Sequence, residues 1–215
     1  CSDKKVRVFD PVAGGKALLE LDVHTGTLEV FTDQATGAPR LACGSYDGNV
    51  RIFDPVAGGD ALVVIDAGSW VNTLAVFKDP ATGALRFACG RGDGKVRIFD
   101  PVAGGEALVV LKGHTDEVRA LTVSDEVRAL TVFTDPTTGG LRLASGSGYS
   151  VRVWDLAAGG AALFVLEGHT SRIEVMTAFA DPATGETRLA SGSEDKTVRV
   201  WDASKGGAAL RVVPF

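Results

Sequence analysis

The sequence predicts an all-β fold built from similar four-stranded antiparallel sheets, and three observations support this. A short apolar segment that ends in an aromatic residue and Asp occurs five times, and the successive Asp residues are 44, 46, 55 and 47 residues apart. The same apolar segments and turn residues surround every copy in the same order. Glycine accounts for 27 of 215 residues, which predicts many turns. A period near 45 residues with four strands per unit is typical of the blades of a β-propeller.

The elements of one unit can be followed in order along the chain. The five signature segments are 6–10, 50–54, 96–100, 151–155 and 198–202. A Gly-Gly turn, an Ala-Leu strand, a Gly-His or similar loop, an apolar strand, an Asp-Pro-Ala-Thr-Gly type of turn and a Leu-Ala-Ser-Gly-Ser type of strand follow. We therefore expect a single domain over residues 1–215, with a partial blade at 1–22. Complete blades are expected at about 23–66, 67–111, 112–166 and 167–213.

About four and a half blades are thus expected, which predicts an incomplete ring or, as the alternative, a strained small ring. Propellers usually close with 4 to 8 blades, and seven blades of this period need roughly 315 residues. The first residue is Cys1 and the only methionine is Met176, so we expect the true start of the protein to lie upstream. An incomplete ring leaves apolar faces and open strand edges, through which the chain could associate with itself.

Within this pattern, the last unit resembles the WD-repeat β-propeller family. The matching residues are Gly168-His169, the segment 189–193, Asp195 and the segment 197–202. The resemblance extends over essentially the whole chain, because several motifs recur in the same order and phase. It implies a protein-interaction scaffold without catalytic activity.

The resemblance also implies a hydrogen-bonded network of His169, Ser191, Asp195 and Trp201. A buried indole N–H needs an acceptor, and a hydroxyl can accept that bond while donating another. His, Ser and Asp together also suggest a hydrolase triad. We favour the structural interpretation because the three histidines, His24, His114 and His169, are assigned to the same repeat position. A Gly-x-Ser-x-Gly nucleophile motif is also absent from the sequence.

The other units depart from this network in a chemically consistent way. Cys43 and Cys89 replace the serine in the two units where Phe53 and Phe99 replace the tryptophan. A phenyl ring has no donor that requires a hydroxyl, so these blades are expected to depend on apolar packing. The three cysteines are expected to be buried free thiols in a reducing compartment, which predicts a cytoplasmic or nuclear protein.

The long interval of 55 residues contains a duplication. Residues 116–123 have the same sequence as residues 125–132, and removal of nine residues restores the interval to 46. Either copy could serve as the inner strand, so the register is ambiguous. We predict that the second copy pairs in the sheet, because it continues into Phe133 and the Asp135-Pro136 turn, and that the first copy forms a loop.

Four antiparallel strands per blade place alternate connections on opposite faces of the ring. The Asp-Pro-Ala-Thr-Gly and Gly-Gly turns share one face, which is expected to be uniform and to carry few large side chains. The connections on the other face vary from unit to unit, and aromatic and Arg side chains are the usual anchors of interfaces. We therefore expect a peptide or protein to bind on this variable face, through Tyr46, Trp70, Arg91, Tyr149, Arg172 and Glu194.

Other classes of function receive little support from the sequence. The net charge of −5 argues against nucleic acid, and no apolar stretch is long enough to span a membrane. No phosphate-binding loop or metal-ligand spacing is present, so no enzyme activity, metal or cofactor is expected. Arg91-Gly92-Asp93 is a lone tripeptide, and Asp93 already fits a structural turn. The alternative function is that of a regulatory or sensor module attached to a catalytic domain, such as a kinase or NTPase, outside this segment.

Overall fold

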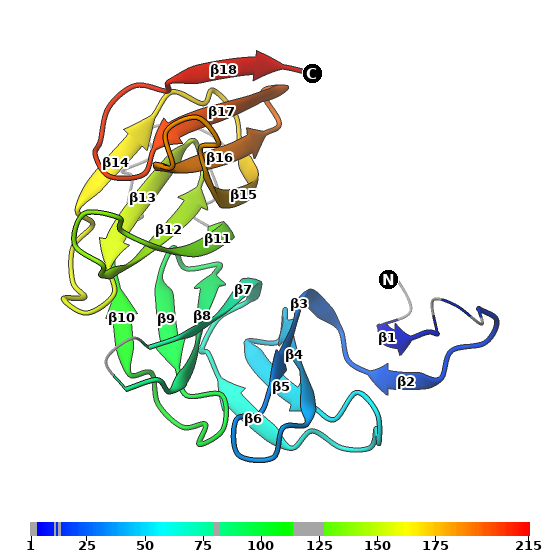
Figure 1. Ribbon diagram of the computed structural model, residues 1–215. Helices are drawn as coiled ribbons and strands as arrows, with labels where there is room; N and C mark the ends of the chain where they lie inside the picture. Colours follow the sequence, from blue (N-terminus) through cyan, green and yellow to red (C-terminus); the bar gives the residue numbers. More distant parts are fainter. Residues whose placement is uncertain (1–3, 11, 13, 80–81, 114–126) are drawn as a thin grey trace.

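The computed structural model describes residues 4–10, 12, 14–79, 82–113 and 127–215, and these form an all-β arc of consecutive sheets (Figure 1). The chain has one two-stranded and four four-stranded antiparallel sheets within these residues. The predicted fold class is confirmed. The arc is open in Figure 1, where β1 and β18 lie at opposite ends, so the alternative of a strained small ring is not what the chain adopts.

Each sheet is one blade with its strands in sequence order. The half-blade contains β1 (Lys5–Val8) and β2 (Leu19–Asp22), and the second blade contains β3 (Thr25–Thr32), β4 (Pro39–Ser45), β5 (Asn49–Phe53) and β6 (Val63–Asp66). The third blade contains β7 (Val71–Lys78), β8 (Leu85–Arg91), β9 (Val96–Phe99) and β10 (Val109–Leu111), and the fourth contains β11 (Val127–Thr134), β12 (Leu141–Ser147), β13 (Ser150–Asp155) and β14 (Phe164–Glu167). The fifth blade contains β15 (Ile173–Ala180), β16 (Thr187–Ser193), β17 (Thr197–Asp202) and β18 (Arg211–Pro214).

The second copy of the duplicated segment, and not the first, pairs with β12 in the fourth blade. Strand β11 contains most of residues 125–132, and Leu130 pairs with Ser145 of β12, so the second copy is the inner strand, as predicted. The first copy, 116–123, lies outside the described residues, and so does the expectation that it forms a loop. The inner strand carries a register shift at its start in all four complete blades, for example between Ile173 and Val175. A β-bulge at this place is therefore part of the repeat.

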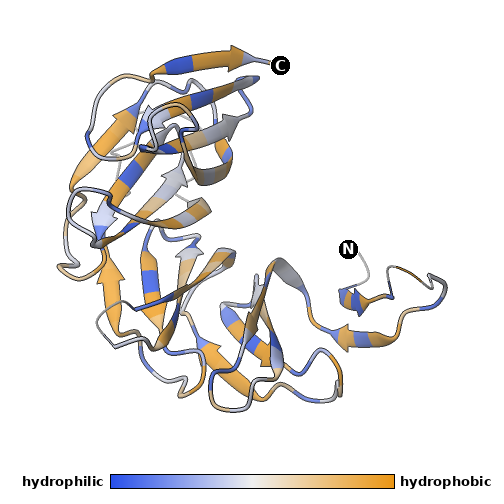
Figure 2. Cartoon of the chain, in the orientation of Figure 1, coloured by the Kyte–Doolittle hydropathy of each residue, from blue (hydrophilic) through white to orange (hydrophobic). Residues whose placement is uncertain are grey.

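The core consists of the faces at which successive blades pack together. Each blade has a leading face toward the preceding blade and a trailing face toward the following one. Phe31, Val50 and Ile65 on the trailing face of the second blade pack with Leu74 and Phe87 on the leading face of the third. Figure 2 shows the matching hydropathy pattern, in which the strands carry most of the apolar residues and the turns are polar. Apolar burial between blades thus holds the arc together.

A glycine in the second strand of the blade allows this close approach. A Cβ atom on Gly44 would lie 2.5 Å from Cγ1 of Val71, and one on Gly146 would lie 2.7 Å from Cγ2 of Ile173. Both contacts are with the first residue of the next inner strand. Any larger side chain would therefore push two blades apart.

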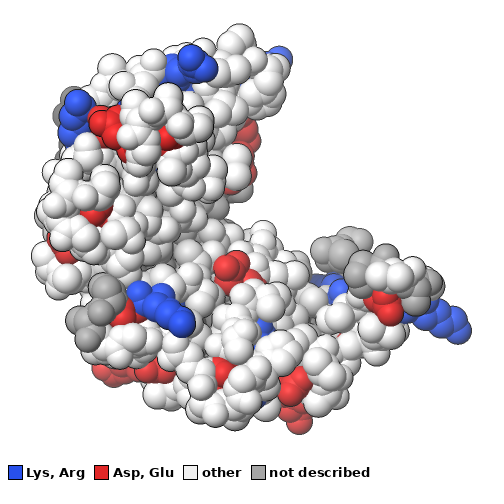
Figure 3. All heavy atoms as spheres, viewed as in Figure 1, with Lys and Arg blue, Asp and Glu red and all other residues white. Residues whose placement is uncertain are grey.

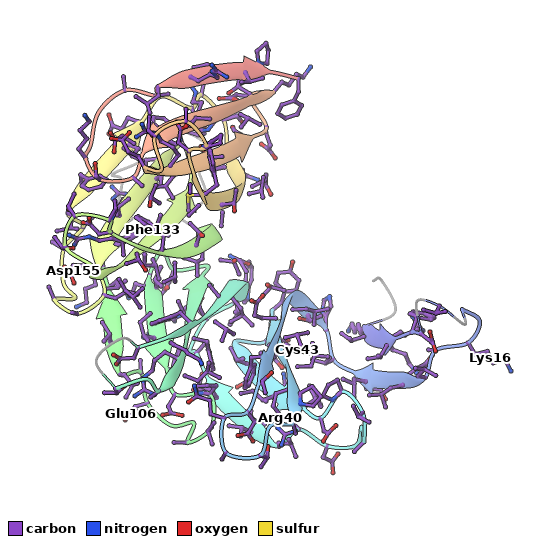
Figure 4. All side chains as sticks on the ribbon, viewed as in Figure 1. Lys16, Arg40, Cys43, Glu106, Phe133 and Asp155 are labelled. Carbon is purple, nitrogen blue, oxygen red and sulfur yellow. The ribbon has the colours of Figure 1, made fainter. Side chains whose placement is uncertain are left out.

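An arginine near the start of the second strand bridges two turns of its own blade. Arg142 contacts Asp135 at 3.0 Å and Asp155 at 2.7 Å. The equivalent Arg40, which is labelled in Figure 4, contacts Asp33 and Asp54. The same aspartates cap their turns, since Asp54 Oδ1 accepts the N–H groups of Val56 and Ala57. Sequence reasoning missed this bridge, although the recurrence of Arg40, Arg86, Arg142 and Arg188 at one repeat position would have indicated it.

Candidate functional site

The four residues of the predicted network meet inside the fifth blade. The indole N–H of Trp201 donates to Ser191 Oγ over 2.8 Å, and Ser191 Oγ is 2.8 Å from His169 Nε2. His169 Nδ1 is 2.8 Å from Asp195 Oδ2. A neutral imidazole with its proton on Nδ1 satisfies every bond, because Ser191 then donates to Nε2 and Nδ1–H donates to the carboxylate. The chain of bonds leaves none of these polar groups unpaired.

Asp195 is held in its ionised form at the end of this chain. Burial acts to raise the pKa of this carboxyl, but the hydroxyl of Thr197, the backbone N–H of Thr170 and His169 all donate to it and hold its pKa well below the usual range. The imidazole is thereby fixed in one orientation.

The geometry of this network does not suit nucleophilic catalysis. Ser191 is fully buried, and its oxygen already accepts the indole N–H. A catalytic serine must reach its substrate, and an activated one needs a free path to the reacting carbonyl. The network therefore connects two strands and a loop of the fifth blade.

His24 does not occupy the position of His169, which corrects the assignment made from the sequence. Three residues separate Leu21 of β2 from Thr25 at the start of β3, whereas six separate the equivalent Leu166 and Ile173. The shorter connection places His24 directly before the inner strand, where its side chain is exposed. It makes an edge-to-face contact with the ring of Tyr46, at a centroid separation of 5.3 Å. His114 lies outside the described residues.

The cysteines of the second and third blades are buried, as the replacement pattern suggests. Cys43 and Cys89 are both 0% exposed, and burial raises the pKa of each thiol to about 12. Protonated, inaccessible thiols do not act as nucleophiles or metal ligands. Across the described part of the chain, no group of three or more His, Cys, Asp or Glu residues is arranged to hold a metal ion.

The variable face is formed by the turns between the second and third strands of a blade and by the connections to the next blade. Tyr46 follows β4, and Trp70 precedes β7. Their exposed fractions are 44% and 55%, and Tyr149 between β12 and β13 is 42% exposed. All three aromatic residues therefore present substantial surface to solvent on the same face.

Tyr46 borders a surface pocket of about 430 Å³. Its ring lies against Gly26, where a Cβ would approach Cζ of Tyr46 to 3.0 Å. The pocket is lined by Lys4, Asp22, Val23, His24, Ser45, Tyr46, Asp47 and Arg51. Asp47 pairs with Arg51 at 2.7 Å, so the polar lining carries charges of both signs around one aromatic side chain.

Arg91 does not belong to this exposed set, and its assignment to the binding surface is wrong. Only 2% of its surface is accessible, and Nη2 forms an ion pair with Asp93 at 3.1 Å. The side chain extends beneath the connection before β7, where a Cβ on Gly68 would lie 3.3 Å from Nη2. The Arg91-Gly92-Asp93 tripeptide is thus paired internally, which leaves its arginine unavailable to an adhesion receptor.

Arg172 and Glu194 lie together in the fifth blade, at the positions that Trp70 and Gly92 occupy in the third blade. The backbone N–H of Glu194 donates to the carbonyl of Arg172 over 2.9 Å, and its carboxylate accepts a bond from Ser171. Glu194 is exposed and Arg172 is half-buried. This pair presents a polar, charged part of the variable face rather than an apolar anchor.

The opposite face differs from expectation in the size of its side chains. It is uniform, as predicted, but a leucine precedes the outer strand in every blade and remains half-exposed. These residues are Leu18, Leu62, Leu108, Leu163 and Leu210, with exposed fractions of 49–71%. The expectation of few large side chains there was wrong, because the backbone N–H of each leucine is anchored on the third strand while its side chain projects outward.

Charge is dispersed over the molecule. Figure 3 shows acidic and basic side chains interspersed among all the blades on the face in view. A single basic stripe, which phosphate backbones require, is not visible there. The structure contains no helix, within the described residues, that is long and apolar enough to cross a membrane.

Comparison with known proteins agrees with this geometry. No curated protein matches the chain in sequence. The crystal structure of the computationally designed Ika8 protein is similar, with a TM-score of 0.67 and 26% identity over 98% of this chain. The chain spans 56% of the length of that designed protein. A family model described as "WD domain, G-beta repeat" matches residues 16–54, 105–155 and 160–202, which is more than half of the chain. The chain therefore belongs to the WD40 repeat family.

Proposed function

We propose that the chain is a non-enzymatic scaffold that binds a peptide or protein on its variable face. WD40 repeats and a propeller-like fold suggest a protein-interaction scaffold, and the family is generally non-catalytic. We choose this face because the side chains of Tyr46, Trp70 and Tyr149 are exposed on it. Aromatic side chains bury large areas at little cost in conformational entropy, so they are the usual anchors of such interfaces.

The pocket beside Tyr46 supports a more specific binding mode. It offers one aromatic wall, the Lys4 and Arg51 cations and the Asp22 and Asp47 carboxylates. A short peptide with an apolar side chain flanked by charged residues would complement this lining. Trp70 belongs to the next blade along the arc, and it would contact the continuation of such a peptide. Arg172 and Glu194 would contribute polar contacts at the rim.

A peptide selected from a random display library on the wild-type chain provides a direct test. Double replacement Tyr46→Ala and Trp70→Ala should weaken its binding at least tenfold, because two exposed anchors are lost. The melting temperature should change little, since both side chains are about half exposed. The matched control is Leu62→Ala with Leu108→Ala, which removes two equally exposed apolar side chains from the opposite face. The proposal would be contradicted if the Tyr46 and Trp70 substitutions left peptide binding unchanged while the Leu62 and Leu108 substitutions weakened it.

A further inference from the structure

The fifth blade has an uncovered apolar trailing face. Val175, Phe179 and Val213 on this face are 61%, 38% and 44% exposed. Val198 and Val200 of β17 lie between them and are only partly covered. This is a continuous patch of apolar side chains on the last sheet of the arc.

The repeat itself shows what kind of surface fits this face. In the fourth blade the equivalent residues are Ala129, Phe133 and Leu166, which are 4%, 7% and 1% exposed. They are buried by Ile173, Met176 and Leu189 on the leading face of the fifth blade. The complementary surface for the fifth blade is therefore the leading face of another blade.

Such a leading face is half open at the other end of the arc. Leu28 and Val30 of β3 are 45% and 66% exposed, whereas Leu74 and Leu130 at the position of Leu28 are 6% and 9% exposed. The half-blade has no strands opposite β3, so it covers only the outer part of this face. Val6, Leu21 and Val23 bury Leu41, Cys43 and Phe53 there.

The half-blade occupies the same place on the second blade that a complete blade would fill. Val6 pairs with Leu21 across β1 and β2, as Val198 pairs with Val213 in the fifth blade. Among the described residues, the half-blade interface buries six hydrophobic side chains, whereas the interface between the second and third blades buries eleven. A complete blade would therefore bury more apolar area than the half-blade does, and apolar burial sets the free energy of packing.

We propose that two copies of this chain associate head to tail, so that the fifth blade of each packs on the second blade of the other and displaces its half-blade. Each copy contributes four complete blades, and two copies supply eight, which is within the range at which propellers close. A head-to-tail contact forms a closed ring when its rotation closes, and otherwise grows into a filament. The assembly is a two-copy ring in which both exposed apolar ends are buried.

Sedimentation velocity of the full chain over a range of concentrations tests this assembly. The wild-type chain should convert to a species of twice its 22.3 kDa mass and stop there. Phe179→Asp at the tail and Val30→Asp at the head should each raise the dissociation constant at least tenfold with unchanged circular dichroism, because both side chains are exposed in the single chain. The control is Val102→Asp, an equally apolar and 56% exposed residue of the third blade, away from both ends, which should leave the dimer intact.

Two further measurements make the arrangement falsifiable in detail. A mixture of Phe179→Asp and Val30→Asp chains retains one wild-type interface, so it should form a weak heterodimer that neither variant forms alone. Backbone amides of β1 and β2 should lose hydrogen-exchange protection on dimerisation, while those of β3 and β15 gain it. A wild-type chain that stays monomeric, polymers that grow with concentration, or β1 and β2 amides that remain protected in the dimer would each overturn the proposal.

Discussion

The fifth and third blades have different residues at three equivalent core positions. In the fifth blade, Trp201 pairs across the strands with Leu189, and its indole N–H begins the hydrogen-bond chain through Ser191. In the third blade, Phe99 pairs with Phe87, their ring centroids are 5.7 Å apart, and buried Cys89 replaces the serine. The smaller Phe99 is thus compensated by a larger neighbour. One backbone position can be stabilised either by a satisfied polar network or by a matched aromatic pair.

The two blades also differ in whether the family model matches them. The family model matches the fifth blade through to Trp201-Asp202, but residues 55–104, which contain β7–β9, lie outside the matched segments. The strand pairing of the third blade is nevertheless the same as that of the fifth. The matched segment 16–54 of the second blade likewise has Cys43 and Phe53 in place of the serine and tryptophan, so blades inside and outside the matched segments share one fold.

Loss of the central hydroxyl should have the largest effect on this comparison. Ser191→Ala leaves the indole N–H of Trp201 and the Nε2 of His169 buried without partners. At about 1–3 kcal/mol for each such group, the free energy of unfolding should fall by roughly 2–6 kcal/mol. Urea unfolding followed by circular dichroism measures the change. The exposed Ser204→Ala should cost less than about 0.5 kcal/mol. Equal effects of the two substitutions would refute a role for the network in stability.

The reciprocal change in the third blade should be nearly as damaging. Phe99→Trp places a larger ring against Phe87 and adds an indole N–H where Cys89 supplies only a weak acceptor, so we expect a loss of about 2–4 kcal/mol. The triple variant with Phe87→Leu and Cys89→Ser copies the Leu, Ser and Trp of the fifth blade, and it should recover at least half of that loss. No recovery would show that the two kinds of packing are not interchangeable.

A double-mutant cycle should resolve the bond between Trp201 and Ser191. Trp201→Phe removes the donor, so Ser191→Ala should then cost less than it does in the wild type, with a coupling energy of about 1–2 kcal/mol. The four unfolding free energies are compared under one set of conditions. Additive losses would mean that the 2.8 Å contact contributes no net stability.

The pH dependence of unfolding should distinguish the network of the fifth blade. Because the folded pKa of Asp195 lies below its unfolded value, ionised Asp195 favours the folded state above the ordinary aspartate pKa of about 4. That contribution is lost as the pH falls through the folded pKa. Asp195→Asn should therefore destabilise the chain at pH 7 and make its stability less dependent on pH below 4. Parallel pH profiles for the two proteins would contradict this assignment.

The smallest effect is expected for the thiols of the apolar blades. Cys43 and Cys89 are inaccessible and have pKa values raised to about 12, so they should not react with a maleimide in the native chain. Peptide mapping should show modification of both residues only in denaturant. Modification of either residue in the native chain would show that its blade opens to solvent.

The sequence predicted the features that recur in phase and missed those that depend on loop length or on neighbours. The strands and the inner position of the second duplicated copy follow from repetition. The approach of His169, Ser191, Asp195 and Trp201 follows from the resemblance to the WD-repeat family. His24 was misplaced because three missing residues move it along the backbone without changing the repeat pattern. Arg91 was misjudged because its charge predicts exposure, whereas Asp93 and the space over Gly68 accommodate it inside.

The contact between Gly44 and Val71 has a consequence for how the molecule unfolds. Each blade buries its apolar face only when the next blade packs against it. The free energy of folding of the arc is therefore a sum over the blades and the interfaces between neighbouring blades, as in a one-dimensional lattice. In a single copy of the chain, interior blades gain from two neighbours and terminal ones from a single neighbour. Unfolding should therefore propagate inward from the termini, beginning at the N-terminal strands, where the fewest side chains are buried.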